Sequence, residues 1–397
     1  MTATQLPVRS IEADESDLRE PAAGIALCLS GGGYRAMLFH AGALKCINDA
    51  GYLRALNRVS SVSGGSITAG VLGIHWKRLA FRKGVATNFD ELLITPLRNL
   101  AGVTVDVCAV GWGLVLPGSV NDQLAAAYRK YLFGDRTLQD LPQESEGEAP
   151  RFIFNATNVQ TGVLMRFSRP YLADYLVGRV PYPRVELAAA VAASSAYPPF
   201  LSPTHIDLST ANWITDRGNK LTQPDYRSTA ILTDGGVYDN LGLETAWKRY
   251  RTVLVSDGGG AIAPEKTPYT DWPRHSMRVV DLVDNQVRSL RKRQLIDSYE
   301  LPAGHPYHRK GTYWGIRSDV ADYHLPHHAG DPFSPARCPH DETLALADIP
   351  TRLATLPAIT QKRLINWGYA VCNVALRRWV NPEIKATGFP YPKAGIG

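Results

Sequence analysis

Residues 30–36 read Ser-Gly-Gly-Gly-Tyr-Arg-Ala and directly follow the short apolar run Ile25-Ala26-Leu27-Cys28-Leu29. An apolar run of this length predicts a buried strand, and the stretch from about Tyr34 to Ala50 predicts a helix. Glycines between a strand and a helix allow backbone N–H groups to converge, and the positive end of the helix dipole adds to them. The stretch therefore predicts an α/β fold with a turn that can hold a negatively charged oxygen.

A second turn of the same kind lies at Ser61-Val62-Ser63-Gly64-Gly65, after a short strand near Val59 and before a helix from about Ser66. A serine nucleophile on a sharp strand-to-helix turn needs small neighbours, because larger side chains would collide there. Ser63 has small neighbours, although Ser61 stands where the usual G-x-S-x-G pattern has glycine. Alone, such a cluster is more typical of a loop. Together, the two turns indicate the nucleophile and the oxyanion hole of an acyl-transfer site.

A third candidate is Asp234, in Thr233-Asp234-Gly235-Gly236 at the end of a strand predicted at 230–233. Open α/β sheets place their chemistry at the carboxyl ends of strands, so this aspartate is a candidate base for Ser63. Asp257, in Asp257-Gly258-Gly259-Gly260 after a strand predicted at 252–256, has the same pattern and competes for the role. An ordinary Asx turn would also explain either motif.

With these motifs in this order, the chain resembles the patatin-like phospholipases over roughly residues 24–262. That family combines a glycine-rich oxyanion loop, a serine turn and a D-G-[AG] motif whose aspartate completes a Ser–Asp dyad. Ser61 in place of glycine and Gly236 in place of the commoner alanine are small departures. The inner strand at 154–158 and the proline-closed helix at 193–200 extend the resemblance.

The resemblance implies a hydrolase that cleaves fatty-acyl esters of phospholipids or lysophospholipids through an acyl-enzyme, without a metal or cofactor. The implied residues are Ser63 and Asp234 for catalysis, Gly31, Gly32 and Gly33 for the oxyanion hole, and Arg35 and Gly64 for substrate binding. Anchoring of the glycine loop by a salt bridge is an equally good role for Arg35. The glycine turn fits neither G-x-G-x-x-G nor the P-loop pattern, which argues against nucleotide binding.

Two other functions stay open. A Ser-His-Asp esterase would need a histidine after the acidic residue, and a signal-gated lipid effector would show little basal turnover. His40, in the first predicted helix, is interpreted as a packing residue. The later histidines fit no zinc motif together with Cys338, so no metal site is predicted. These later histidines are His275, His305, His308, His324, His327, His328 and His340.

The predicted fold class is α/β, with three α/β/α layers around a mostly parallel sheet and a mostly helical C-terminal extension. We expect a loose arm at 1–23, a catalytic domain at 24–262 and the extension, packed on the core, at 263–397. Within the catalytic domain, residues 85–150 are a cap-like insertion that includes the apolar patch 103–117. A helix is expected where Val280, Val283, Val287 and Leu290 recur, with basic residues between them.

Composition fits an ordinary folded enzyme. The 397-residue chain is 45% hydrophobic and 20% charged, with a net charge of +6 and a pI near 9.0. This charge favours anionic surfaces such as phospholipid headgroups, but the dense basic runs of a nucleic-acid binder are missing. The first residues lack a secretory pattern, no apolar run reaches membrane-spanning length, and the five cysteines are scattered. We therefore expect a cytoplasmic, peripherally membrane-associated protein that could also assemble with copies of itself.

Overall fold

The computed structural model describes residues 20–105, 119–144, 149–216, 218–326 and 330–397. A ten-stranded sheet forms its centre, in the order β12-β11-β1-β2-β5-β6-β7-β8, with β10 paired to β5 and β9 paired to β10. The strands are β1 (Ala22–Leu29), β2 (Leu56–Ser61), β5 (Arg151–Asn158), β6 (Val163–Phe167), β7 (Tyr171–Asp174), β8 (Gly178–Pro181), β9 (Thr204–Asp207), β10 (Thr229–Asp234), β11 (Tyr250–Asp257) and β12 (Lys310–Gly315). A separate hairpin pairs β3 (Phe81–Arg82) with β4 (Val85–Ala86).

Strand direction divides the sheet into two parts. The strands β12, β11, β1, β2 and β5 run parallel to one another. From β5 outward the pairing becomes antiparallel, through β6, β7 and β8 on one path and through β10 and β9 on the other. The sheet is therefore mixed, with four parallel pairings from β12 to β5 and five antiparallel pairings beyond.

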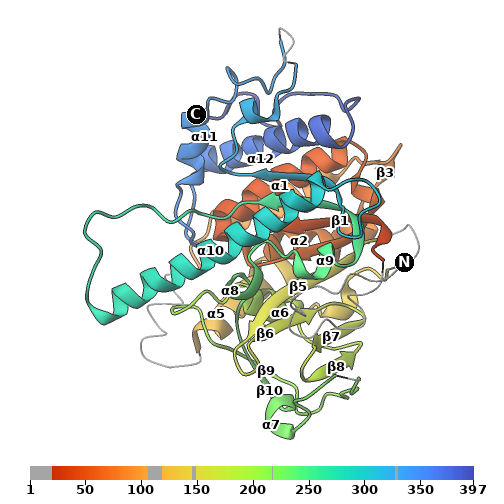
Figure 1. The fold of residues 1–397 in the computed structure, drawn as a ribbon, viewed down its shortest axis with the longest axis vertical. Coiled ribbons are helices and arrows are strands. Elements are labelled where there is room, and N and C mark those ends of the chain that lie inside the picture. Colours follow the sequence, from red (N-terminus) through yellow and green to blue (C-terminus); the bar gives the residue numbers. More distant parts are fainter. Residues whose placement is uncertain (1–19, 106–118, 145–148, 217, 327–329) are drawn as a thin grey trace.

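Helices cover both faces of the sheet (Figure 1). The helices are α1 (Gly33–Asp49), α2 (Gly64–His75), α3 (Thr95–Ala101), α5 (Ser119–Tyr128), α6 (Leu187–Ser194), α7 (Pro224–Arg227), α8 (Gly236–Asp239), α9 (Glu244–Trp247), α10 (Trp272–Glu300), α11 (His340–Ala347) and α12 (Ala358–Trp379). Short 3₁₀ or π turns occupy Leu53–Ala55, Trp76–Arg78, Asp90–Ile94, Arg129–Phe133, Leu138–Asp140 and Val320–Tyr323.

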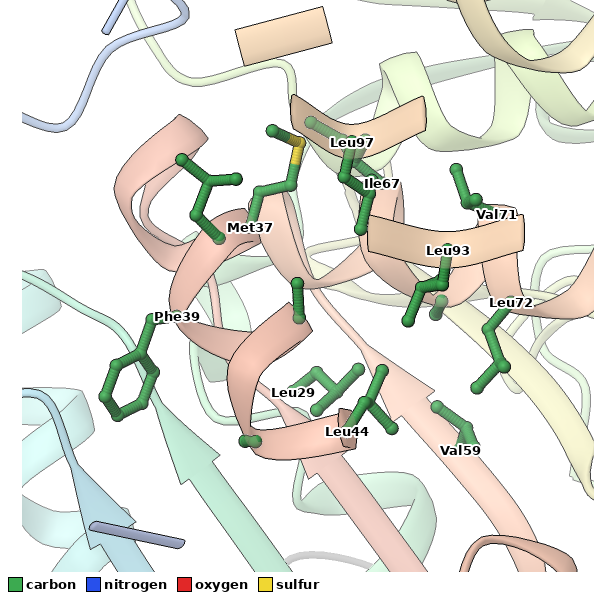
Figure 2. Close-up of a cluster of buried hydrophobic side chains, with 14 of the residues drawn as sticks. Leu29, Met37, Phe39, Leu44, Val59, Ile67, Val71, Leu72, Leu93 and Leu97 are labelled. Atoms are coloured by element: carbon green, nitrogen blue, oxygen red, sulfur yellow. The ribbon is translucent and has the colours of Figure 1, made fainter. Parts of the chain in front are cut away.

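Alternate residues of β1 supply the two cores that hold these layers together. Leu27 and Leu29 point to the larger core, which also contains residues of α1, α2, α6 and α12. Figure 2 shows part of it, where Met37, Ile67 and Leu97 meet above the strands. Ala26 and Cys28 point to the opposite core, formed with residues of β11 and α9 and with one residue of α10. This alternation is the period of a strand buried on both faces, and it confirms the predicted three layers.

The C-terminal part of the chain joins the main sheet as well as covering it. The sequence predicted a mostly helical region there, and α10, α11 and α12 confirm helices. In addition, β12 pairs in parallel with β11 at one edge of the sheet. Helix α12 lies against α1 (Figure 1), so closely that a Cβ at Gly42 would meet the Ile365 carbonyl oxygen at 2.0 Å.

The predicted arm and insertion are only partly within the described ranges. Residues 1–19 lie outside them, as do residues 106–118, which hold most of the apolar patch predicted at 103–117. Around that gap, Phe89, Leu93 and Leu100 belong to the large core. No helix in the described ranges combines the length and apolar character needed to cross a bilayer.

Candidate active site

Ser63 sits in a strained backbone conformation between β2 and α2. Its φ of 50° is rare for a residue with a side chain, and its ψ is −120°. The following glycine is required by space, because a Cβ at Gly64 would lie 2.3 Å from the Gly33 carbonyl oxygen. The Ser63 N–H donates to Ser194 Oγ over 3.0 Å, which ties the turn to α6. These are the features of a turn that exposes a serine hydroxyl at the top of a sheet.

Asp234 ends β10 and brings its carboxyl group to Ser63. Its Oδ1 accepts a hydrogen bond of 2.7 Å from the Gly236 N–H. The pKa of Asp234 is raised to about 7, chiefly by burial and to a smaller extent by the charge of Asp284. Hydrogen bonds from the Gly236 N–H and the Ser63 hydroxyl act in the opposite direction and lower this pKa. A carboxyl group that titrates near neutral pH can accept a proton from a bound nucleophile and return it later.

The direction of β10 corrects the reasoning by which Asp234 was predicted. Asp234 pairs with Ala156 of β5 in an antiparallel ladder, whereas Ser61 of β2 pairs with Phe154 of β5 in parallel. The aspartate therefore enters from the direction opposite to β2, and the rule for carboxyl ends of parallel strands does not apply to it. It reaches the serine because β5 extends beyond the end of β2.

The three loop glycines differ in what their N–H groups can do. The Gly31 N–H already donates to Asn240, over 3.1 Å to the backbone oxygen and over 2.9 Å to Oδ1. In the described part of the chain, the N–H groups of Gly32, Gly33 and Gly64 have no hydrogen-bond acceptor. These three groups lie at the starts of α1 and α2, where helices leave N–H groups unpaired. They can stabilise an oxyanion, whereas the Gly31 N–H holds the loop to Asn240.

We expect Gly32→Ala to lower both activity and stability. Gly32 has a φ of +139°, and an added Cβ would lie 2.8 Å from the Gly258 carbonyl oxygen. The loop must move, so kcat/KM should fall about 10²–10³-fold, as when an oxyanion donor is lost. The strain should cost about 1–3 kcal/mol in thermal unfolding. The control is Gly162→Ala, because Gly162 also has a positive φ but has open space around its Cβ position. Wild-type turnover in Gly32→Ala would contradict this role of the loop.

Arg35 makes the contacts of an anchor. Its Nε donates to the Gly258 carbonyl oxygen over 3.3 Å, and its Nη2 donates to Thr351 Oγ1 over 2.9 Å. A further bond goes from Nη1 to the Ile349 carbonyl. Burial lowers the pKa of Arg35 to about 10, so the side chain stays charged at neutral pH. The structure thus connects Arg35 to carbonyl and hydroxyl groups, and Arg35 is not among the described residues that line the cavity beside Ser63.

Asp257, the competing aspartate, has a different environment. Its carboxylate accepts hydrogen bonds from the Gly259 N–H over 2.9 Å and from the Tyr313 hydroxyl over 2.8 Å. Arg288 lies 4.0 Å away. Burial alone would raise the pKa of Asp257, but these partners hold it below its ordinary value. Such a carboxylate stays ionised and is a poor proton acceptor at neutral pH.

Ser63 and Asp234 open into one cavity of about 500 Å³. Gly31, Gly32 and Gly33 line it, together with apolar side chains such as Phe200 and Leu353. Helix α10 supplies one side through Arg278, Asp281, Asp284 and Asn285. The cavity is large enough for a small ligand, and its lining combines apolar side chains with charged and polar ones.

Histidine takes no part in this arrangement within the described ranges. None of the described residues that line the cavity is a histidine. His40 is buried between Ser30 O and Ser256 Oγ, at 2.9 Å and 2.8 Å, and burial lowers its pKa to about 4. His327 and His328 lie outside the described residues. No group of three or more potential metal ligands is found among the residues that the structure describes.

Two residues that support the turns were not singled out from the sequence. Asn240 follows the Asp234 motif and holds Gly31. Ser194 lies on the proline-closed helix and accepts the Ser63 N–H. Both side chains act over long sequence separations, so no local pattern marks them.

Comparison with known proteins gives a consistent result. The family model for patatin-like phospholipase matches residues 27–247, which is more than half of the chain. No curated protein matches the chain. Human GIVD cytosolic phospholipase A2 has a similar fold, with a TM-score of 0.51 at 14% identity over 91% of this chain and 62% of that chain. VipD from Legionella pneumophila aligns at 16% identity over 82% of this chain and 66% of its own, with a TM-score of 0.29 that supports no further argument. The chain thus spans less than two thirds of the human enzyme.

Proposed function

The chain belongs to the patatin-like phospholipase family, and from this premise we propose that it hydrolyses fatty-acyl esters of phospholipids or lysophospholipids. The observation that carries the proposal is the meeting of Ser63 and Asp234 in one cavity beside unpaired backbone N–H groups. We place the activity at a membrane surface in the cytoplasm. Residues 24–262 act as the catalytic domain, to which residues 263–397 add β12 and the cavity-lining face of α10.

In the first step, Ser63 Oγ attacks the carbonyl carbon of the ester while Asp234 accepts the hydroxyl proton. The carbonyl oxygen becomes negatively charged and is stabilised by the N–H groups of Gly32, Gly33 and Gly64, with the positive ends of α1 and α2 behind them. The C–O bond then breaks, and Asp234 returns the proton to the leaving alcohol. An acyl group remains covalently bound to Ser63.

In the second step, water attacks the acyl carbon and Asp234 accepts a proton from it. The oxyanion forms again at the same N–H groups, the bond to Ser63 Oγ breaks, and the serine recovers its proton. The products are a fatty acid and free enzyme. The protein groups that the proposed steps use all belong to the turns after β1, β2 and β10.

A dyad is favoured over a Ser-His-Asp triad by the composition of the cavity. Asp234 interacts with Ser63 directly, and no histidine lines the cavity among the described residues. In a triad, an imidazole would separate the serine from the carboxylate. The proposal therefore gives Asp234 both roles, orientation of the serine and transfer of its proton.

The test is product analysis with the isolated protein. Mixed phospholipid vesicles are incubated with the wild-type protein, and free fatty acids and lysophospholipids are measured by mass spectrometry. Release of both products, absent with Ser63→Ala, supports the proposal. No turnover of phospholipid, lysophospholipid or soluble ester would overturn it and favour the signal-gated effector instead.

The pH dependence of kcat/KM should follow the ionisation of Asp234. Because the base must be ionised, activity should rise with pH and level off above about 7. The charge of Asp284 raises the pKa of Asp234, so Asp284→Asn should move the rising limb to lower pH. Asp297→Asn, farther along α10, serves as the control. An unchanged profile in Asp284→Asn, or a shift to higher pH, would contradict this coupling.

A further inference from the structure

Helix α10 has its polar face towards the protein and its apolar face towards solvent. Trp272, Val279, Val283 and Leu290 are separated by seven, four and seven residues, which places them on one side of the helix. Their exposed fractions are 82%, 43%, 57% and 56%. This row is called the outer stripe of α10 below. A surface helix normally shows the reverse arrangement, so the stripe indicates a contact with something outside the described chain.

The opposite side of α10 faces the candidate active site. Asp281, Asp284 and Asn285 line the catalytic cavity, and Arg288 lies beside Asp257. Of the α10 side chains, all of them described, only Leu295 and Ser298 are buried, both near the C-terminal end of the helix. In Figure 1 the N-terminal half of α10 extends beyond the neighbouring labelled elements. The outer stripe is therefore accessible, and it lies on the same helix whose other side lines the cavity.

We propose that the outer stripe of α10 docks on an anionic lipid bilayer, and that this contact sets the catalytic cavity against the membrane. The proposal rests on the proposed function, because a lipid hydrolase must take its substrate from such a surface. An amphipathic helix that carries a tryptophan and an apolar row can lie in the headgroup region, with that row below the surface. Phe200, which is 51% exposed and lines the cavity, adds exposed apolar surface at the cavity itself.

The charge around the outer stripe favours an anionic bilayer over a second copy of the chain as its binding partner. Residues 272–293 contain six basic and two acidic residues, so this segment is attracted to anionic lipid and repelled by its own copy. Some of these basic residues are engaged within the protein. Arg288 faces Asp257, and Arg291 lies 2.9 Å from Glu244. Docking therefore relies mainly on the apolar row, with long-range attraction from the net charge.

The experiment measures binding of the full chain to vesicles of phosphatidylcholine with phosphatidylglycerol, and to vesicles of phosphatidylcholine alone, by flotation. The stripe variant is Trp272→Gln/Val279→Gln/Val283→Gln, in which glutamine preserves helix propensity. The control variant is Trp379→Gln/Val159→Gln/Tyr175→Gln, which removes apolar side chains outside α10 that are 60%, 57% and 47% exposed. Thermal melting checks that both variants are folded. Ser63→Ala is used as the background, so that binding is read without hydrolysis.

We expect the stripe variant to bind anionic vesicles about tenfold more weakly or worse, and the control variant to bind as the parent does. In the Ser63-containing protein, the same stripe changes should reduce vesicle hydrolysis but leave turnover of a soluble short-chain ester unchanged. Equal binding by all three proteins, or an equal loss in both variants, would overturn the proposal. So would conversion of a dimer to a monomer by the stripe changes without loss of vesicle binding. Failure of the proposed function would appear separately, as wild-type protein that binds vesicles but hydrolyses no ester.

Discussion

Ser63→Ala should abolish ester hydrolysis and covalent labelling by a fluorophosphonate. The substitution removes the only atom that can form the acyl-enzyme in the proposed mechanism, and loss of a serine nucleophile costs at least about 10⁴-fold in rate. Little else changes, because the Ser63 backbone N–H still bonds Ser194. The measurements are turnover of a soluble ester and gel fluorescence after labelling of the folded protein.

The matched control for this experiment is Ser195→Ala. Ser195 also lines the cavity, but its hydroxyl donates to the Val191 carbonyl oxygen over 2.8 Å, and it is not on a strand-to-helix turn. Labelling should therefore persist in Ser195→Ala and disappear in Ser63→Ala. Labelling that survives Ser63→Ala at full intensity would assign the nucleophile to another residue.

The turns that carry Ser63 and the glycine loop were predictable because the strand, the glycines and the helix of each turn follow one another directly in the sequence. Apolar runs ending at Leu29 and near Val59 form strands, and the following glycines are demanded by close backbone contacts. Gly64 against Gly33 O, at 2.3 Å, is one such contact. A glycine directly after a predicted strand therefore indicates a tight turn at that position. The helix was expected from about Ser66 and begins slightly earlier, at Gly64.

The position of Asp234 was predicted for a reason that the fold does not satisfy. The sequence shows that a strand ends at Asp234, but strand direction depends on which strands pair across the sheet. β10 is antiparallel to β5, so the aspartate meets Ser63 from the other side. Local pattern therefore left Asp234 and Asp257 as competitors, and only the sheet explains why Asp234 lies beside Ser63.

Long-range contacts account for most of what the sequence did not reveal. The pairing of β12 with β11 joins residues more than fifty positions apart, as in Thr252 with Lys310. The bond from Gly31 to Asn240 spans 209 positions. The sequence showed periodic apolar residues in α10, of which Val283 and Leu290 belong to the outer stripe. Periodicity gives a face without saying whether that face points inward. Each of these depends on tertiary packing.

Asp234→Asn should lower kcat/KM at least about 10³-fold, whereas Asp257→Asn should keep activity within about tenfold. Asparagine preserves the size of the side chain but cannot accept the Ser63 proton. Asp257 is held by Gly259 and Tyr313 and does not line the cavity among its described residues. Turnover of a soluble ester by the two purified variants is the measurement. An inactive Asp257→Asn beside an active Asp234→Asn would reverse the assignment of the base.

The same pair of variants should change thermal stability in opposite directions, which gives an independent check on the environment of each carboxyl group. The pKa of Asp234 is raised from 3.8 to about 7, so its contribution to stability is present at low pH and is lost as pH rises towards 7. Asp234→Asn should therefore melt above wild type at about pH 8, and this advantage should shrink towards pH 5. The pKa of Asp257 is lowered, so this carboxylate stabilises the fold at neutral pH, and Asp257→Asn should lose about 1–3 kcal/mol there. A lower melting temperature for Asp234→Asn at pH 8 would mean that Asp234 is held as a stable carboxylate, which is incompatible with a base that titrates near 7.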